Sequence, residues 1–350
     1  MGSFKDTLDT TRVRANDPFT SSVIVSRMTF PSRKVPWRPS AVILVPPEPY
    51  HFSFLAASLI HFPINATFLF TQADTLLNIT LEEILRLSPR GDCLPAPVLL
   101  VGPIGFSVES RLLRYGFRTL RIQGRDVFET AANAAFFRLL TVSPKAKKGR
   151  DHILVVSADT GMEGLSATYY SAHQGTPIVF VTRTSIPSPT KAVAAKFADR
   201  TFTLFGSEKT ISRRVEEELR GIVSHVDRIE GENPYEISVH FARRSEPRLG
   251  WNRNVKGRGD AFSFGTLSAW QKAVSGVLFA HLGKHTPLLL VRSDRVPSVV
   301  REYLLFLNPA EPKPPMPPFM HGFILGDEGD IADSVQTELE EHLILRAEEH

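Results

Sequence analysis

The sequence predicts an α/β protein of three tandem units, each with its own parallel sheet, arranged about a pseudo-threefold axis. Two observations predict this fold class. The first is an internal repeat, because three segments that open with Arg12, Arg121 and Arg228 read alike and begin at nearly equal intervals along the chain. The second is the alternation of continuous apolar strands with helices, which is typical of parallel sheets covered on both faces.

Each unit contains the same elements in the same order. After the opening segment and a short helix, first strands are expected at 41–45, 153–157 and 261–264. Helices of small and apolar residues are expected at 54–60, 164–173 and 271–282, and second strands at 67–71, 177–182 and 287–291. The third strands end at Gly102, Gly206 and Gly326.

The helix after each of these glycines has a repeating apolar pattern. After both Gly206 and Gly326, apolar residues follow at the same distances along the chain and four residues apart. This spacing places them in one apolar stripe along a helix. In the first unit the pattern is expected to be shifted by one residue, with Val108 and Leu112 on the stripe.

The repeat divides the chain into units 1–119, 120–226 and 227–350. Residues 1–30 are expected to pack on the third unit and so to close a ring. A proline-rich insert at 309–318 lengthens the third unit before its last strand. Such a segment is stiff and extended, and it fits either a subunit contact or an exposed connection.

Composition excludes several classes of protein. The chain has 350 residues, of which 42% are hydrophobic and 22% charged, so it is globular rather than disordered. A single cysteine, Cys93, excludes an internal disulfide framework and a multi-cysteine metal site. No apolar run is long enough to span a membrane, which argues against membrane insertion, and no secretory signal peptide is visible at the N-terminus.

The repeated motifs resemble the bacterial cell-wall-binding repeat type 2 family, whose repeats come in threes. The clearest matches are Arg121-Ile122-Gln123-Gly124 with Phe128-Glu129-Thr130-Ala131, and Gly206 with Ile211-Ser212. The resemblance covers roughly residues 11–345. It implies a triangular arrangement of Rossmann-like domains and non-covalent binding of anionic envelope polymers in grooves between domains. It also implies a location at the cell surface or outside the cell, with the export route left undetermined.

The chain departs from this family at one motif. The family carries an F-P-D-A-L sequence after the first strand of a unit, and its aspartate is missing here from 51–55, 161–165 and 268–272. The loss leaves open whether ligand binding persists.

Basic clusters are the strongest candidates for binding a polyanion. They occupy the link from opening helix to first strand in all three units, and three such loops about an axis would form a ring of positive charge. The candidate polymer-binding residues are Lys147, Lys148, Arg150, Trp251, Arg253, Lys256 and Arg258, with Arg12, Arg121 and Arg228 at the domain junctions. Arg33, Lys34, Trp37 and Arg38 occupy the same link in the first unit. The alternative for the loops is simple solvation, and for the junction arginines it is pairing with acids.

The sequence contains no recognisable group of residues for catalysis, metal binding or cofactor binding. No catalytic residues, metal site or cofactor are predicted, since no nucleophile elbow, paired carboxylates or phosphate-binding glycine loop is present. His281 and His285 have the spacing of metal ligands on a helix, but they are interpreted as a solvated helix end. Nucleic acid is a secondary candidate ligand without a recognised motif.

Three functions follow in order of preference. The first is a non-enzymatic surface protein that binds an anionic cell-wall polymer. The second is a self-assembling subunit of a surface layer or filament, with copies of itself as partners. The third is an enzyme that acts on a sugar or nucleotide in a domain cleft.

Overall fold

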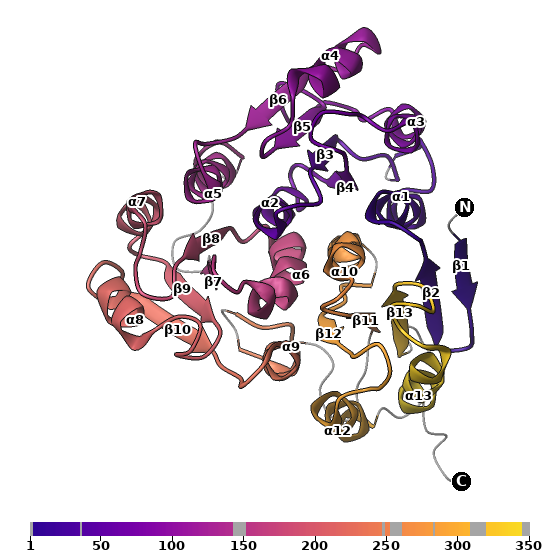
Figure 1. Cartoon of the computed structure of the whole chain (residues 1–350). Helices are drawn as coiled ribbons and strands as arrows, with labels where there is room; N and C mark the ends of the chain where they lie inside the picture. Colours follow the sequence, from indigo (N-terminus) through magenta and orange to yellow (C-terminus); the bar gives the residue numbers. More distant parts are fainter. Residues whose placement is uncertain are drawn as a thin grey trace.

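The computed structural model describes residues 3–35, 37–142, 152–246, 249–252, 261–282, 284–308 and 320–344. They form three sheets, each flanked by helices (Figure 1). The predicted α/β class with three parallel-sheet units is confirmed, and one antiparallel strand is added at the edge of the third sheet.

The first sheet has the order β4-β3-β5-β6 and is entirely parallel. Its strands are β3 (Ala41–Val45), β4 (Ala66–Phe70), β5 (Val98–Val101) and β6 (Thr119–Ile122). The connecting helices are α2 (Tyr50–Ala56) with the short η1 (Ala57–Leu59), α3 (Asn78–Leu87) and α4 (Phe106–Arg114), and α1 (Pro18–Thr29) packs on β4. Every residue of β3 and β4 is buried, as their continuous apolar sequence predicts.

The second sheet repeats this order as β8-β7-β9-β10, again all parallel. Its strands are β7 (His152–Ser157), β8 (Ile178–Val181), β9 (Thr201–Phe205) and β10 (His225–Ile229). Its helices are α5 (Val127–Phe136) with η2 (Phe137–Val142), η3 (Met162–Gly164), α6 (Leu165–Gln174), α7 (Ser188–Lys196) and α8 (Arg213–Arg220).

The third sheet has the order β1-β2-β13-β11-β12. Its parallel strands are β11 (Ala261–Gly265), β12 (Leu288–Leu290), β13 (His321–Leu325) and β2 (Thr10–Arg14), and β1 (Ser3–Asp6) pairs antiparallel with β2. Its helices are α9 (Pro234–Arg243), α10 (Trp270–Ser275), α11 (Val277–His281), α12 (Ser298–Leu307) and α13 (Asp333–Leu343).

The strand in each opening segment belongs to the sheet of the preceding unit. β6 pairs with β5, β10 pairs with β9, and β2 pairs with β13 from the far end of the chain. Both predicted internal boundaries fall inside such strands. We propose to divide the chain by its sheets, so that β6 ends the first unit, β10 ends the second and β2 completes the third.

The helices that open the units are capped in the same way. Asp17 accepts from the Thr20 amide, and Asp126 accepts from the Glu129 amide. Asn233 does the same at α9 by accepting from the amide of Glu236. This equivalence explains why the opening segments read alike, since each encodes a strand followed by a helix N-cap.

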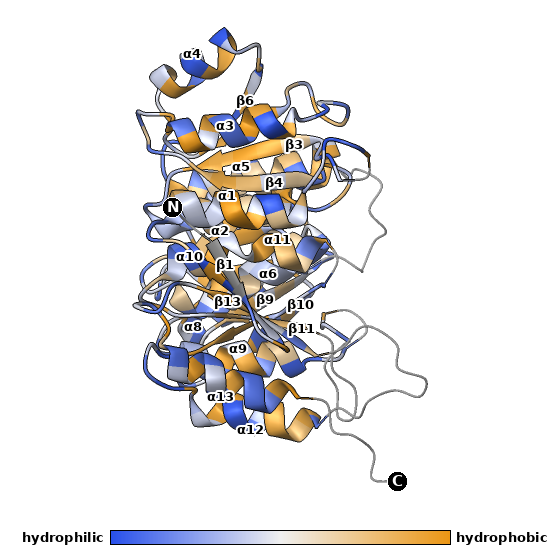
Figure 2. Cartoon of the chain, turned by 90° about the vertical axis from the view of Figure 1, so that its right-hand side faces the viewer, coloured by the Kyte–Doolittle hydropathy of each residue, from blue (hydrophilic) through white to orange (hydrophobic). Residues whose placement is uncertain are grey.

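Three helices, one from each unit, meet at the centre of the molecule. α2, α6 and α10 contact one another pairwise and lie between the three sheets (Figure 1). The apolar strands lie sandwiched between helices with polar outer faces (Figure 2). The core is therefore continuous from one unit to the next, and most of it forms a single cluster of buried side chains.

Candidate functional site

The three predicted junction arginines occupy equivalent positions on the last parallel strand of each sheet. Arg121 lies opposite Leu100, Arg228 opposite Leu204 and Arg12 opposite Ile324, each time one residue before the end of the neighbouring strand. A glycine follows that strand, and its amide donates to the carbonyl of the residue after the arginine. This backbone hydrogen bond therefore recurs at the same position in all three units.

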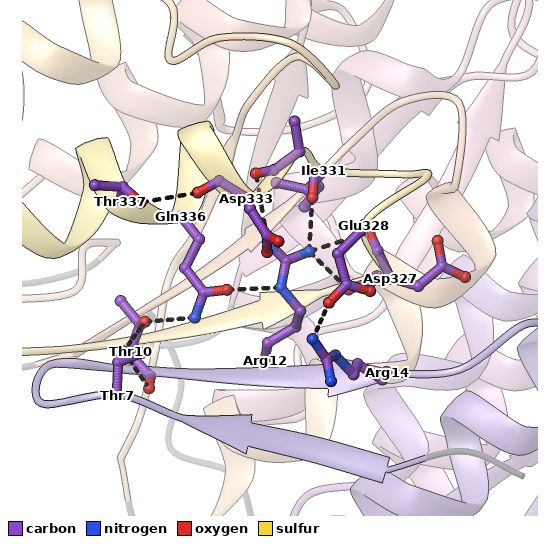
Figure 3. Close-up of polar contacts among 12 residues, drawn as sticks. Thr7, Thr10, Arg12, Arg14, Asp327, Glu328, Ile331, Asp333, Gln336 and Thr337 are labelled. Atoms are coloured by element: carbon purple, nitrogen blue, oxygen red, sulfur yellow. Dashed lines mark hydrogen bonds and ion pairs between the residues drawn. The ribbon is translucent and has the colours of Figure 1, made fainter.

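Arg12 is completely buried and its guanidinium holds together the start of α13 (Figure 3). Nε donates to Oε1 of Gln336 at 2.7 Å, and Nη1 donates to the Ile331 carbonyl at 2.6 Å and the Asp327 carbonyl at 3.1 Å. Asp333 forms an ion pair with it at 3.7 Å. Burial lowers the pKa of Arg12, and neighbouring acids oppose that shift.

Arg228 repeats this arrangement with a carboxylate where Arg12 has an amide. It donates to both the Gly206 and Ile211 carbonyls and to Oε2 of Glu216 at 2.6 Å. Burial raises the pKa of Glu216, but hydrogen bonds from Arg220 and Arg228 outweigh burial and hold that pKa below its ordinary value.

Arg121 is the most exposed of the three. It donates to the Ile104 carbonyl and to Oε2 of Glu109, and 25% of its side chain is exposed. Hydrogen bonds from Thr119 and Arg121 lower the pKa of Glu109. The loop before α4 is three residues shorter than its two counterparts, so the predicted shift of one residue in this unit is corrected to three.

These contacts show that the three arginines stabilise the fold of their own units. Arg12 is buried without access to a polymer, and only 7% of the Arg228 side chain is exposed. The prediction that Arg12 contacts a polymer is therefore corrected, since its donors go to carbonyls and a side-chain amide of its own unit. Pairing with acids, the alternative drawn from the sequence, describes Arg121 and Arg228.

Trp251 also lies inside the protein. It is 3% exposed and stacks on the His173 ring with centroids 5.3 Å apart, while Tyr170 and Phe241 contact its edges. The prediction that Trp251 contacts a polymer is corrected, because the tryptophan joins the end of α9 to α6 as a core residue.

Most predicted basic loop residues fall outside the described residues. These are Lys147, Lys148, Arg150, Arg253, Lys256 and Arg258, and the proline-rich insert 309–318 lies outside them as well. In the sequence, the two basic segments directly precede β7 and β11.

The equivalent segment of the first unit is described, and it exposes a tryptophan beside basic side chains. Trp37 is 52% exposed, and Lys34 is also exposed. Arg33 donates to the carbonyls of Leu85 and Arg86 at the end of α3. Because these partners are backbone carbonyls, the hydrogen bonds leave the positive charge of Arg33 uncompensated.

Arg38 is held in the same way. It donates to both the carbonyl and the hydroxyl of Ser88, just beyond α3. We call Arg33, Lys34, Trp37 and Arg38 the first basic segment. Sequence reasoning preferred Trp251 over Trp37, and the structure reverses the two.

Acids gather at the opposite ends of the strands. Beyond the carboxyl ends of β13 and β2, the loop before α13 carries Asp327, Glu328 and Asp330, and among the described residues Lys272 and Arg14 pair with them. Beyond β10, Glu230 and Glu232 line a pocket with His240 and Lys209, and Lys209 pairs with Glu232. Among the described residues, acids thus collect beyond the carboxyl ends of β13, β2 and β10, a surface that we call the acidic carboxyl-end face. The first basic segment lies before the amino end of β3, on what we call the amino-end face.

The described residues contain no group of three or more His, Cys, Asp or Glu side chains positioned to hold a metal ion. No helix in the described part of the chain is both long and apolar enough to cross a membrane.

Comparisons with known proteins agree with the repeat architecture. Residues 121–216 match the family described as Cell wall binding domain 2. These residues run from the opening arginine of the second unit to Glu216, the carboxylate partner of Arg228.

Two curated proteins of Bacillus subtilis (strain 168) are similar to the chain. The amidase enhancer is 24% identical over 306 residues, which are 86% of this chain and 38% of that protein. The N-acetylmuramoyl-L-alanine amidase LytC is 22% identical over 236 residues, 67% of this chain and 42% of that protein. The chain thus spans less than half the length of either relative.

Two solved structures share the fold. Cwp8 from Clostridium difficile superposes over 97% of this chain and 52% of its own, with a TM-score of 0.75 at 20% identity. Cwp6 from the same organism covers 96% of this chain and 49% of its own, with a TM-score of 0.74 at 15% identity. The three-unit architecture therefore occurs in other proteins.

Proposed function

We propose, from the match of residues 121–216 to the Cell wall binding domain 2 family, that the chain is a non-enzymatic cell-wall-binding protein of the cell surface or exterior. We further propose that its ligand is an anionic envelope polymer and that the amino-end face binds it.

The separation of charge between the two faces is the observation that carries the proposal. Arg33 and Arg38 spend their hydrogen bonds on carbonyls, so their charges remain available to phosphate or carboxylate groups. Trp37 adds an exposed aromatic surface on which an apolar sugar face can stack. The acidic carboxyl-end face would repel the same polymer, which gives binding a defined side.

A charge-reversal pair tests this proposal. Lys34→Glu alters the amino-end face, and Lys209→Glu is its matched control, because Lys209 is exposed beyond the carboxyl end of β9. We expect Lys34→Glu to weaken cosedimentation with purified cell walls about fivefold at low salt, the equivalent of about 1 kcal/mol for a surface charge contact. Lys209→Glu changes the net charge by the same amount and should leave binding nearly unchanged, because Lys209 lies away from the amino-end face.

Salt and polymer content complete the test. Raising the ionic strength from 0.05 M to 0.3 M should release the wild-type protein, and walls stripped of anionic polymer should not bind it. Equal losses for the two variants, or undiminished binding to stripped walls, would refute the assignment of the amino-end face.

A second candidate function, self-association, is favoured by the outer surface of α4. Helices α4, α8 and α13 can be aligned through the residue of each that accepts a hydrogen bond from its junction arginine. In this alignment Glu109, Glu216 and Gln336 are equivalent. On that basis Phe106 takes the place of Arg213 and Asp333. Phe106 is 78% exposed and Leu113 is 53% exposed, on a helix that projects from the edge of the molecule (Figure 2).

The occupant proposed for this α4 surface is a second copy of the chain. Arg111 and Arg114 lie on α4 and Arg118 follows it, whereas α13 carries the acids Glu338, Glu340 and Glu341 and is followed by exposed Ile344. α4 of one copy thus complements α13 of the next in charge, and such a head-to-tail contact propagates into filaments.

Sedimentation velocity over a range of protein concentrations tests self-association. Wild type should form concentration-dependent oligomers, and Phe106→Ser with Leu113→Ser should remain monomeric. Val35→Ser removes an equally exposed apolar residue elsewhere and should not change assembly. A monomeric wild type, or oligomers unaffected by the α4 double variant, would reject the contact. Attachment of wild type to anionic vesicles through α4, without oligomers, would reject it in favour of a lipid surface.

A further inference from the structure

Four histidines meet at the amino-end side of the central junction, and they come from all three units. His61 follows η1, His173 lies in the last turn of α6, and His281 ends α11. These three residues precede the second strand of their respective units, so the repeat brings them together. His285 lies just beyond α11.

The histidines contact one another directly. The rings of His61 and His281 lie with centroids 5.5 Å apart, and those of His173 and His285 lie 4.9 Å apart. The Nδ1 atoms of His173 and His285 are 3.1 Å apart, so at most one of these atoms carries the proton in that contact. We call these four residues the histidine junction.

The junction is enclosed. His281 is 2% exposed, which corrects the prediction of a solvated helix end, and its Nε2 lies 2.9 Å from Oδ1 of Asn65. Nδ1 of His61 and Nδ1 of His281 are buried without a hydrogen-bond partner among the described residues. An uncharged imidazole tolerates an unpaired, unprotonated nitrogen there far better than an imidazolium tolerates an unpaired N–H.

A buried cation lies beside the histidine junction. Arg138 of η2 is 4% exposed and donates to the carbonyls of Phe62 at 2.8 Å and Gly175 at 3.1 Å. Helix α1 also packs on α11, and its single ionisable side chain, Arg27, is paired with Glu83. Exposed Lys284 adds another positive charge next to His285. The contacts named here include no carboxylate that would stabilise a protonated imidazole.

These surroundings keep two of the rings neutral. Burial, together with the positive charge of Arg138, lowers the pKa of His61 to about 3, and burial with the neighbouring His61 lowers the pKa of His281 to about 3. In an unfolded chain a histidine titrates near 6.5. Between these values the unfolded state binds more protons, so the stability that the neutral junction provides is present above pH 6.5 and is lost as the pH falls toward 3.

We propose that the histidine junction is an acid-sensitive latch, which holds the three units together at neutral pH and releases them on acidification. The junction lies on the same side as the first basic segment, and its effect on polymer binding rests on the proposed function. Opening the junction would separate the units and disperse the amino-end face.

Chemical denaturation as a function of pH tests the latch. Two histidines that stay neutral in the fold should lower the folding equilibrium constant by up to about 100-fold for each pH unit below 6. The double variant His61→Gln with His281→Gln removes both titrations, and Gln retains a donor for Asn65. We expect its stability to depend clearly less on pH between 6 and 4.5 than that of wild type. His225→Gln, at an exposed position that opens β10, is the control and should behave as wild type.

An unchanged pH dependence in the double variant would overturn the proposal. Should that variant fail to fold, the imidazole NMR signals of the wild type decide: the two rings should remain neutral in the folded protein at pH 5, and protonation near pH 6.5 would overturn the latch. Polymer binding at pH 7.5 and pH 5 is measured separately. If stability depends on pH as expected but the protein binds no polymer, only the proposed function is refuted. If the protein binds polymer but its stability lacks this pH dependence, only the latch is refuted.

Discussion

The Arg12 guanidinium donates to Oε1 of Gln336 at 2.7 Å, and this bond joins the second strand of the chain to its last helix. Gln336 in turn donates to the Thr10 hydroxyl at 2.9 Å, so the amide is satisfied on both sides. The bond replaces the ion pair that Glu216 and Glu109 form with their arginines. Arg12 thereby satisfies the buried carbonyls of the α13 loop without a buried carboxylate beside it.

The three arginines should differ in their contribution to stability, in the order of their burial. Arg12→Met should cost about 3–5 kcal/mol of unfolding free energy, because it leaves several buried carbonyls without a donor. Arg228→Met should cost less, and Arg121→Met should cost about 1 kcal/mol, since its site is partly open to water. Urea denaturation at neutral pH measures all three.

Arg125→Met is the control for that series. Its side chain is 87% exposed and its ion pair with Glu129 lies at the surface, so the substitution should leave the urea midpoint essentially unchanged. An effect of Arg12→Met as small as that of the control would show that the buried network contributes little.

The contact between the first and second units at Tyr50 should be intolerant of any added atom at Gly161. The Tyr50 hydroxyl donates to the carbonyls of Ser157 and Ala158, and a Cβ on Gly161 would coincide with the tyrosine ring. Gly161→Ala therefore has to displace the ring and should destabilise the protein by well over 2 kcal/mol. The shift of the thermal unfolding midpoint measures this cost.

Gly116→Ala separates the collision from backbone strain. Gly116 has a φ of +83°, similar to the +61° of Gly161, but open space surrounds its would-be Cβ. Its substitution should cost only the left-handed strain, about 1–2 kcal/mol. Equal midpoints for the two variants would contradict the role assigned to Tyr50.

The two tryptophans of the basic links should respond oppositely to substitution. Trp251→Ala should lower the unfolding free energy by about 3–5 kcal/mol, because it empties a buried site between His173 and Phe241. Trp37→Ala should leave stability nearly unchanged and should weaken polymer binding. Denaturation and cosedimentation of the same two preparations give both results, and a reversal of either would contradict the assignment.

Local pattern predicted most of the fold. The strands, the helices between them and the glycines after the third strands follow from apolar runs and repetition, and they appear within a few residues of their predicted positions. The pattern did not assign β6 and β10 to the preceding sheets, because sequence periodicity identifies a strand without identifying its partner. The three-residue deletion before α4 was missed for the same reason, since only the pairing of Arg121 reveals the register.

The candidate site was less predictable than the fold. Trp37 and Trp251 stand in equivalent links with similar basic neighbours, and only packing against His173 distinguishes the buried one. His281 is the last residue of α11, and a glycine and a proline follow within six residues, a sequence that is typical of a solvated helix end. Its burial depends on His61 and Asn65 from another unit, a non-local contact that a single repeat does not encode.

The pairing of β2 with β13 constrains the order in which the growing chain can fold. Residues 10–14 are synthesised before the strand that they join, which is complete only at Leu325. Until then Arg12 has no acceptors and the last sheet has no finished edge. The three units are therefore not independent domains that each become stable as soon as their own residues have been synthesised. The third sheet can therefore be completed only after β13 has been made, and a protease that cuts between the first two units would break the covalent connection between β2 and the rest of that sheet.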